Sequence, residues 1–596
     1  MSAAEHASIA SAPASGAADT KHALGLMTGA LALASDRLSG AMIFALAGSL
    51  FALGHDGLAV LVGLMGGVAL SGLLVAPQMQ RVDALGPISL CRARYGRIAA
   101  ALAAVVLWLA TVPLVAAEIS AVAKAVEFAS GWHGPESLAA ILLAVVTLSL
   151  LLGAGAITMM QALLLPVIVA ALALPLYLAT LGSTAIADLL PQLAYGPALQ
   201  AISAQELVLL ESELADPVTM KAYLRPFLTS SMPQTLMTIL ALSLGVAALP
   251  ALAVRTTAAR DNGDARLIVA FAATLIIVAL LALPPLAAEA RLALLTTVVG
   301  LDVNQLPAAL FEADKRALFT ICGAAPVSQD AVTAACAGLD DPPTRLRLSD
   351  IAIATDGALF LMLALKQLPF APRIAVAAVA ALSGIAAALW MLKAAVRDLT
   401  GQVADTRRAT SPLATIAAHG AIVLVVAAAG ALVSLETADI LTLLSWGLSL
   451  VAGGLAPAVL LGLWWGRATA AGAVAGLIVG AGLTLYYIIA STLFPVAFYE
   501  QWSVLSSAGY GAVLDFEAAR DAWQAAEAAD KATLHAALTE AAHSVANWWG
   551  IRPTAAGALG FAAGLVVTAL VSLITPRPRG RAQQTIALLR RPPAPL

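Results

Sequence analysis

Residues 30–57 read ALALASDRLSGAMIFALAGSLFALGHDG, and they place an acid and a base side by side within an apolar run. Either charge would cost roughly 2.5–3.5 kcal/mol at the centre of a membrane helix. Neighbours at i and i+1 on a continuous helix point in different directions and do not face each other. SDRLSG therefore predicts a broken helix whose unwound backbone lines a cavity and holds the charges. The alternatives are a charge pair packed against other helices and a span that begins later.

The composition points to one membrane body. The chain has 596 residues, of which 61% are hydrophobic and 11% charged, and its mean hydropathy is +0.91. A soluble domain is nearer 45–50% apolar and about 25% charged. The net charge of −3 gives no sign of a nucleic-acid partner. We therefore expect membrane lipid, not nucleic acid, around this chain.

Apolar runs and their breakers predict twelve membrane spans. They lie near 22–50, 57–77, 98–120, 137–153, 156–182, 233–254, 265–289, 371–395, 413–434, 438–465, 468–494 and 554–575. Residues 354–365 are too short to span and are expected to be re-entrant or external. Residues 1–21 lack the pattern of a signal peptide and are expected to form a disordered tail.

The charges orient these spans. With the N-terminus inside, the cytoplasmic loops collect arginines, namely Arg81, Arg92, Arg94, Arg97, Arg255, Arg260, Arg266, Arg397, Arg407, Arg408 and Arg467, and the tail adds Arg577, Arg579, Arg581, Arg590 and Arg591. The opposite loops hold most of the acids. This positive-inside pattern predicts a multi-pass protein of the bacterial inner membrane with both termini cytoplasmic.

Three long segments are expected outside, at 183–232, 290–353 and 495–553. Residues 515–543 predict one amphipathic surface helix. Cys322 and Cys336 lie on the oxidising side of the membrane, where a disulfide can form. Spacing alone does not decide between a disulfide and two free thiols. Cys91 lies in a cytoplasmic loop and is expected to be a reduced structural thiol.

A second span looks interrupted. The run MTILALSLGVAALPALAVR carries Gly245 and Pro250 near its middle, and proline removes a backbone donor. The first span opens one set of five and this sixth span opens the next, as an inverted five-plus-five repeat requires. The repeats then cover 22–182 and 233–465, the two last helices fall within 466–575, and 576–596 is a basic tail. A kink without function is the alternative.

Enzyme motifs of the HExxH, P-loop and nucleophile-elbow types are absent from the sequence, so we expect no enzyme. Several other stretches together resemble the solute:sodium symporter family, in the branch of cation/acetate symporters and two-component large subunits. They are ASDRLSGAMIFALAG, GHDGL, RARYG, GVAALPALAVRTTAARDNGDAR, LGLWWGRATAAGAVAGLIVG and NWWGIRP. The resemblance covers roughly 22–580. It implies an all-α polytopic protein of about 12 transmembrane helices, with a LeuT-type 5+5 core plus two C-terminal helices.

The resemblance also implies binding sites. It places a cation between the first and eighth core helices, at Ala34, Arg37, Leu38, Ala380, Ser383 and Gly384. It places a substrate at Asp36, Ser39, Glu118, Thr158, Gln161, Gly245, Leu249 and Pro250. The family's second hydroxyl in helix eight is here Gly384, its aromatic residue after the first aspartate is Arg37, and its His after Leu-Pro is Ala251. We therefore expect a degenerate sodium site.

The resemblance implies a cation-coupled secondary transporter of a small, monocarboxylate-like organic anion. The coupling ion is expected to be sodium or a proton, and no further cofactor is expected. The sequence does not decide whether a small membrane subunit is a partner. Arg37 could replace the cation's charge, bind a substrate carboxylate, or only neutralise Asp36 or Glu118 with coupling lost. In each case we expect a buried Arg37 paired with a carboxylate. The alternative function is a degenerate, non-transporting membrane sensor or accessory protein.

Overall fold

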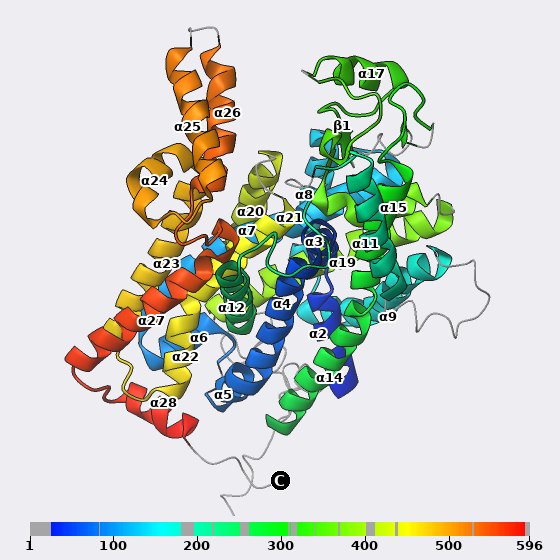
Figure 1. Ribbon diagram of the computed structural model, residues 1–596. Helices are drawn as coiled ribbons and strands as arrows, with labels where there is room; N and C mark the ends of the chain where they lie inside the picture. Colours follow the sequence, from blue (N-terminus) through cyan, green and yellow to red (C-terminus); the bar gives the residue numbers. More distant parts are fainter. Residues whose placement is uncertain are drawn as a thin grey trace, which may run out of the picture.

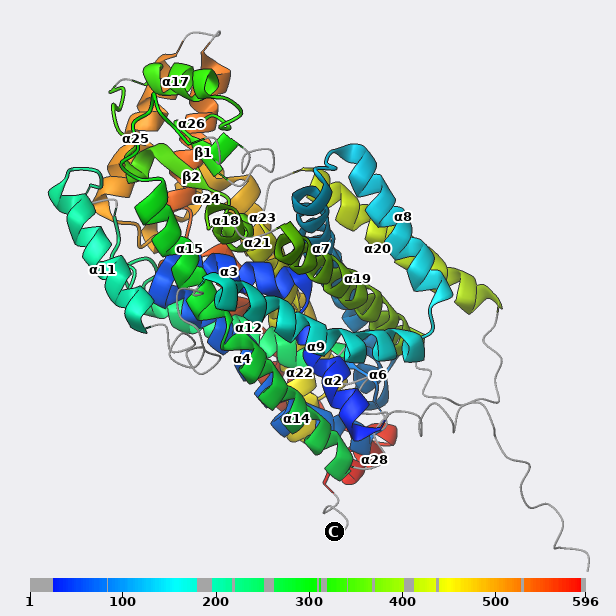
Figure 2. The same ribbon diagram turned by 90° about the vertical axis from the view of Figure 1, so that its right-hand side faces the viewer.

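The computed structural model is almost entirely helical (Figures 1 and 2). It describes residues 25–82, 84–179, 196–216, 220–250, 262–307, 310–311, 319–339, 341–366, 370–400, 412–435, 439–526 and 530–590. The tail expected at 1–21 lies outside these residues. So do parts of the loops expected at 183–232 and 290–353, as well as Ala251, Arg255, Arg260, Arg407, Arg408 and Arg591.

The first half of the described chain contains α2 (Leu26–Arg37), α3 (Gly40–Leu53), α4 (Leu58–Leu70), α5 (Ala76–Arg81), α6 (Pro87–Arg94), α7 (Arg97–Ser130), α8 (Pro135–Leu151), α9 (Ala154–Ala179), α11 (Gly196–Glu211), α12 (Met232–Ala248), α14 (Asn262–Leu280) and α15 (Leu283–Thr297). The second half contains α17 (Gln329–Ala337), α18 (Ala358–Leu365), α19 (Phe370–Thr400), α20 (Pro412–Ser434), α21 (Ile440–Leu450), α22 (Ala456–Trp464), α23 (Ala470–Leu493), α24 (Pro495–Trp502), α25 (Tyr510–Ala525), α26 (Lys531–Val545), α27 (Ala556–Ile574) and α28 (Arg581–Leu589). Strands β1 (Phe319–Ile321) and β2 (Ile351–Ile353) pair antiparallel.

The described helices fit a membrane protein. Within the described residues, nine continuous helical runs are long and apolar enough to cross a membrane. Three further apolar helices are shorter, namely Pro135–Leu151, Met232–Ala248 and Thr355–Leu365. Each of the twelve ranges expected to span contains helix. The first two ranges differ from expectation, because Gly40–Arg81 forms one helical run. A short 3-10 turn at Gly54–Gly57 joins α3 to α4 within it.

Close helix packing explains a glycine series in α23. Gly472, Gly476 and Gly480 recur every four residues and line the contact with α27 and the turn before α22. A Cβ added to Gly476 would lie 1.8 Å from Thr568 Oγ1, and one added to Gly480 would lie 2.1 Å from the Gly453 carbonyl oxygen. Small residues thus let these helices approach each other closely, as in other membrane bundles.

Two small lobes project at one end of the molecule, opposite α28 (Figure 1). One holds β1, β2 and α17, and a disulfide joins Cys322 to Cys336 with Cα atoms 5.0 Å apart. The other is a hairpin of α25 and α26. The prediction of a single surface helix over 515–543 is therefore wrong, because the segment forms parts of two helices. Both halves of that segment carry apolar residues, and Phe516 of α25 is buried together with Leu538 of α26.

The opposite end contains α6, which closes against the last turn of α19. Asp398 is fully buried and accepts hydrogen bonds from Ile88 N (2.8 Å), Ser89 N (2.9 Å) and Ser89 Oγ (2.6 Å). The two amides are free N–H groups in the first turn of α6, so Asp398 caps that helix from a distance in sequence. Cys91 is free and buried. Its burial, and to a smaller extent the nearby Asp398, raises the pKa of its thiol to about 12.

Candidate functional site

The first predicted break is present. Helix α2 ends at Arg37 and α3 begins at Gly40. The amide of Leu38 donates to the Ala34 carbonyl oxygen (3.0 Å), and Ser39 caps α3 by accepting a hydrogen bond from Met42 N (3.2 Å). A serine at this position is a favourable N-cap because its side chain satisfies a backbone donor of the first turn. The helix is therefore interrupted over two residues beside the charged pair.

Asp36 and Arg37 form an ion pair at the end of α2. Arg37 Nε donates to Asp36 Oδ2 (3.2 Å), and Nη2 contacts the same oxygen. Gln161 Nε2 of α9 donates to Asp36 Oδ1 and to the Ala386 carbonyl oxygen, each at 3.3 Å. The expected burial and pairing of Arg37 are confirmed. The premise that sequence neighbours do not pair is wrong here, because the helix ends at Arg37 and its long side chain folds back.

Glu118 of α7 approaches the start of α3. Its side chain is fully buried, and Oε2 accepts a hydrogen bond from Ala41 N (3.1 Å). The Ser39 hydroxyl also interacts with this carboxyl group. The other oxygen, Oε1, has no hydrogen-bond partner among the described residues. We call Asp36, Arg37, Glu118 and Gln161 the break cluster.

The expected cation ligands lie next to the break cluster. Ser383 Oγ donates to the Ala380 carbonyl oxygen (3.1 Å), and that carbonyl abuts α3, since a Cβ added to Gly40 would lie 2.4 Å from it. A Cβ added to Gly384 would lie 3.4 Å from Glu118 Oε2. Ala34, near the end of α2, and Leu38, directly after it, are fully buried in the same region. A carboxyl group therefore occupies the space beside residue 384, where the family has a hydroxyl.

The remaining expected site residues are placed differently. Thr158 is buried in α9, where its hydroxyl donates to the Ala154 carbonyl oxygen (2.8 Å). Gly245 packs against the backbone of Leu448 in α21. Helix α12 runs through Gly245 and ends at Ala248, and Leu249 is extended, so the interruption falls between Gly245 and Pro250 as expected.

Pro250 lies beside α6, with its Cβ 2.7 Å from the position of a Cβ added to Gly86. The residues that follow this break, 251–261, lie outside the described part of the chain. The hydrogen bonds of the break cluster described above reach α2, α3, α7, α9 and α19. The expected meeting of the two breaks at mid-membrane stays a prediction.

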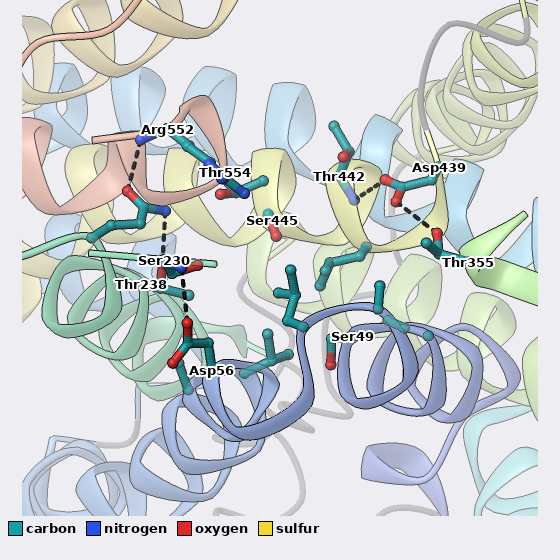
Figure 3. A pocket seen from close by; sticks show the side chains of 18 of the residues that line it. Ser49, Asp56, Ser230, Thr238, Thr355, Asp439, Thr442, Ser445, Arg552 and Thr554 are labelled. Carbon is teal, nitrogen blue, oxygen red and sulfur yellow. Dashed lines mark hydrogen bonds between the residues drawn. The ribbon is translucent and has the colours of Figure 1, made fainter. Parts of the chain in front are cut away.

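A cavity of about 350 Å³ lies at the other end of α3 (Figure 3). It is bordered by α3, α12, the start of α21 and the segment before α27. Asp56 closes one side by accepting hydrogen bonds from Phe227 N (2.7 Å), Thr229 N (2.9 Å) and Ser230 N (2.8 Å). Arg552 lies on another side, where its amide donates to Gln234 Oε1 (2.7 Å). None of the predicted site residues lines this cavity.

A second cavity, of about 730 Å³, adjoins the first and shares Thr355, Asp356 and Asp439 with it. Asp356 pairs with Lys124 Nζ of α7 (2.6 Å), and Asp439 caps α21 by accepting from Thr442 N (2.8 Å). Sequence reasoning missed these residues. Asp439 directly precedes an apolar run, which is an N-cap signal, whereas the Lys124–Asp356 pair joins residues 232 positions apart and has no local signal.

Comparisons with known proteins agree with the sequence reading. Residues 20–303, somewhat less than half of the chain, match the model of the sodium:solute symporter family. An uncharacterized symporter of Cupriavidus necator is 30% identical over 158 residues, which make up 26% of this chain and 17% of that protein. The alignment thus spans less than a fifth of the relative. The predicted resemblance to this family of transporters, rather than to an enzyme, is confirmed.

The fold also has solved counterparts. The substrate-bound, outward-open structure of a Na⁺-coupled sialic acid symporter aligns with 94% of this chain and 92% of its own, with a TM-score of 0.56 and 11% identity. The structure of Mhp1, a nucleobase-cation-symport-1 family transporter, aligns over 95% and 96% with a TM-score of 0.38. The likeness to the sialic acid symporter shows that the fold is all-α and of the LeuT type, as predicted.

Proposed function

Because this chain resembles the sodium:solute symporter family over residues 20–303, we propose that it is a cation-coupled secondary transporter of a small organic anion. The observation that carries the proposal is the interruption between α2 and α3. Charged residues are rare and costly inside a membrane, and Asp36, Arg37 and Glu118 are all buried at this one break. Transporters of this architecture bind their substrates at discontinuous helices.

The 350 Å³ cavity supports a route to that break. Helix α3 borders the cavity through Ser49 and reaches Glu118 through Ala41. Eight residues of helix separate these two positions, or about 12 Å. A solute that enters the cavity therefore needs to travel only a short way along α3. Arg552 offers a positive charge on the wall of the cavity (Figure 3). The aspartates that also line the cavity are engaged by other groups, Asp56 by three backbone amides, Asp356 by Lys124 and Asp439 by the Thr442 amide.

The arginine pattern supports an orientation. Arg81, Arg92 and Arg467 lie at or near the end that carries α28, and Arg81 Nη1 donates to the Leu589 carbonyl oxygen (2.8 Å). We place this end in the cytoplasm of a bacterium and the two lobes outside, in keeping with the positive-inside rule. The disulfide in one lobe suits an oxidising compartment.

Counterflow into proteoliposomes, with equal sodium and equal pH on both sides, tests the transport activity without a gradient of the coupling ion. Vesicles loaded with unlabelled pyruvate are diluted into labelled pyruvate, and protein-free vesicles correct for passive entry. We expect label to accumulate transiently and unlabelled L-lactate outside to suppress it. The absence of protein-dependent exchange for both monocarboxylates would contradict the proposal. It would favour the second candidate, a non-transporting sensor or accessory protein, which the altered residue 384 also suits.

A further inference from the structure

We propose that Glu118 carries the coupling proton, so that this transporter moves a proton together with its anion. The inference rests on the proposed function and names its coupling ion. It starts from the surroundings of one carboxyl group. Glu118 is fully buried within a membrane span, one of its oxygens accepts the Ala41 amide, and the other has no hydrogen-bond partner among the described residues.

The charges around Glu118 leave it uncompensated when it is ionised. Asp36 and Arg37 of α2 are the charged side chains that act on it, and they neutralise each other as a pair. Helix α3 contributes the Ser39 hydroxyl and the Ala41 amide, and α19 contributes Gly384. Helix α21 has no ionisable side chain, while α20 has only the exposed His419. A buried carboxylate without a counter-ion is costly, so the neutral acid suits this environment.

The same carboxyl group occupies the place that an anionic substrate would seek. The expected substrate site relies on the N-terminus of α3, whose backbone donors attract a carboxylate. There the Ala41 amide is already bound by Glu118 Oε2, and the Met42 amide is bound by Ser39 Oγ. An incoming carboxylate must therefore compete with Glu118 for the first turn of α3.

Protonation resolves this competition. A neutral carboxyl group is a weaker acceptor than a carboxylate, because hydrogen bonds to ionised groups are the stronger ones. A proton on Glu118 therefore loosens its hold on Ala41 and removes one negative charge from the break. The substrate carboxylate brings one negative charge back. Binding of the proton and binding of the anion then favour each other reciprocally, which is the linkage that a symporter needs.

The geometry around residue 384 explains why a proton, not sodium, fits this site. Sodium needs several oxygen ligands, and residue 384 supplies no side-chain oxygen. Of the six expected cation-site residues, Ser383 alone has a side-chain oxygen, and its hydroxyl donates to the Ala380 carbonyl oxygen. The carboxylate of Asp36 is already paired with Arg37, so it is not free to bind sodium. A proton, in contrast, joins the carboxyl group of Glu118 itself.

A transport experiment separates the proton inference from the proposed function. Uptake of labelled pyruvate is measured with an inward pH gradient and without one, in sodium and in choline medium, for the natural protein, Glu118→Gln and Glu136→Gln. Glu136 is an exposed carboxylate at the start of α8 and serves as the matched control. We expect the pH gradient to stimulate the natural protein and Glu136→Gln in either medium. Glu118→Gln should lose the stimulation by the pH gradient, whereas Glu136→Gln should keep it.

The outcomes are distinct. Stimulation that persists in Glu118→Gln, or uptake that requires sodium, would overturn the inference while counterflow still supports transport. Counterflow that is absent from the natural protein would overturn the proposed function instead. A spectroscopic arm needs no substrate, since the carbonyl stretch of a buried protonated carboxyl group is visible in the infrared. We expect this band in the natural protein at neutral pH and its loss in Glu118→Gln. Its absence from the natural protein would contradict the inference.

Discussion

Glu118 and Asp398 are both fully buried acids, yet the protein treats them differently. Asp398 accepts three hydrogen bonds from the first turn of α6. Glu118 accepts one backbone hydrogen bond at Oε2, and its Oε1 has no partner among the described residues. Buried polar groups are usually satisfied, so a saturated carboxylate suggests a structural role and an unsaturated one suggests a functional role. This contrast motivates the predictions below, which run from the largest expected effect to the smallest.

The largest effect should come from the charge pair beside Glu118. Removing one member of a buried ion pair typically costs about 3–5 kcal/mol, because the other charge is left uncompensated. We expect Arg37→Met to lower the free energy of unfolding, measured by SDS titration in mixed micelles, by this amount. Asp36→Asn combined with Arg37→Met should recover part of the loss. Arg520→Met, in the hairpin of α25 and α26, is the control. A loss no greater than that of the control would show that the pair does not bear a buried charge.

The next effect concerns Asp398. Each hydrogen bond to a charged group contributes about 1.5–3 kcal/mol, and Asp398→Ala would leave the first turn of α6 without its acceptor. Water that enters the new space offsets part of this, so we expect a net loss of roughly 3 kcal/mol in the same titration. Labelling of Cys91, which is buried on the same helix, should become faster as α6 loosens. Unchanged stability and unchanged labelling would remove the structural role assigned to Asp398.

A smaller effect should follow from a methyl group beside Glu118. A Cβ at residue 384 would lie 2.9 Å from Val122 Cγ2, which is too close without a shift of the neighbouring helix. Overpacking of this kind costs about 1–3 kcal/mol, and Gly384→Ala should fall at the lower end. Gly420→Ala in α20 is the matched control, since nothing lies within 4 Å of its added Cβ. The control should be neutral or stabilising by up to about 1 kcal/mol. Equal effects at the two glycines would mean that α7 and α19 are not tightly packed here.

Local sequence signals carried most of the fold. Apolar runs located helix in all twelve expected spans, and SDRLSG located the first break because charged and small residues interrupt an apolar run there. Gly245 and Pro250 bracketed the second break, since α12 stays regular through Gly245 to Ala248 and the extended Leu249 directly precedes the proline. Contacts between distant positions had no local signal. The approach of Glu118 to Ala41 and of Asp398 to α6 depends on how α7 and α19 pack, which periodicity does not reveal.

The exchange of each acid for its neutral amide tests the contrast most directly. Glu118→Gln keeps an oxygen for the Ala41 amide and resembles the neutral acid, so the unfolding free energy at neutral pH should change by less than about 1 kcal/mol. Asp398→Asn turns one acceptor into a donor that faces the donors of α6, so it should lose about 2 kcal/mol. Both variants are measured by SDS titration at the same pH. A small change for Glu118→Gln and a clear loss for Asp398→Asn are the predicted result. An equal or larger loss for Glu118→Gln would contradict the account, because Glu118 would then be an ionised structural group like Asp398.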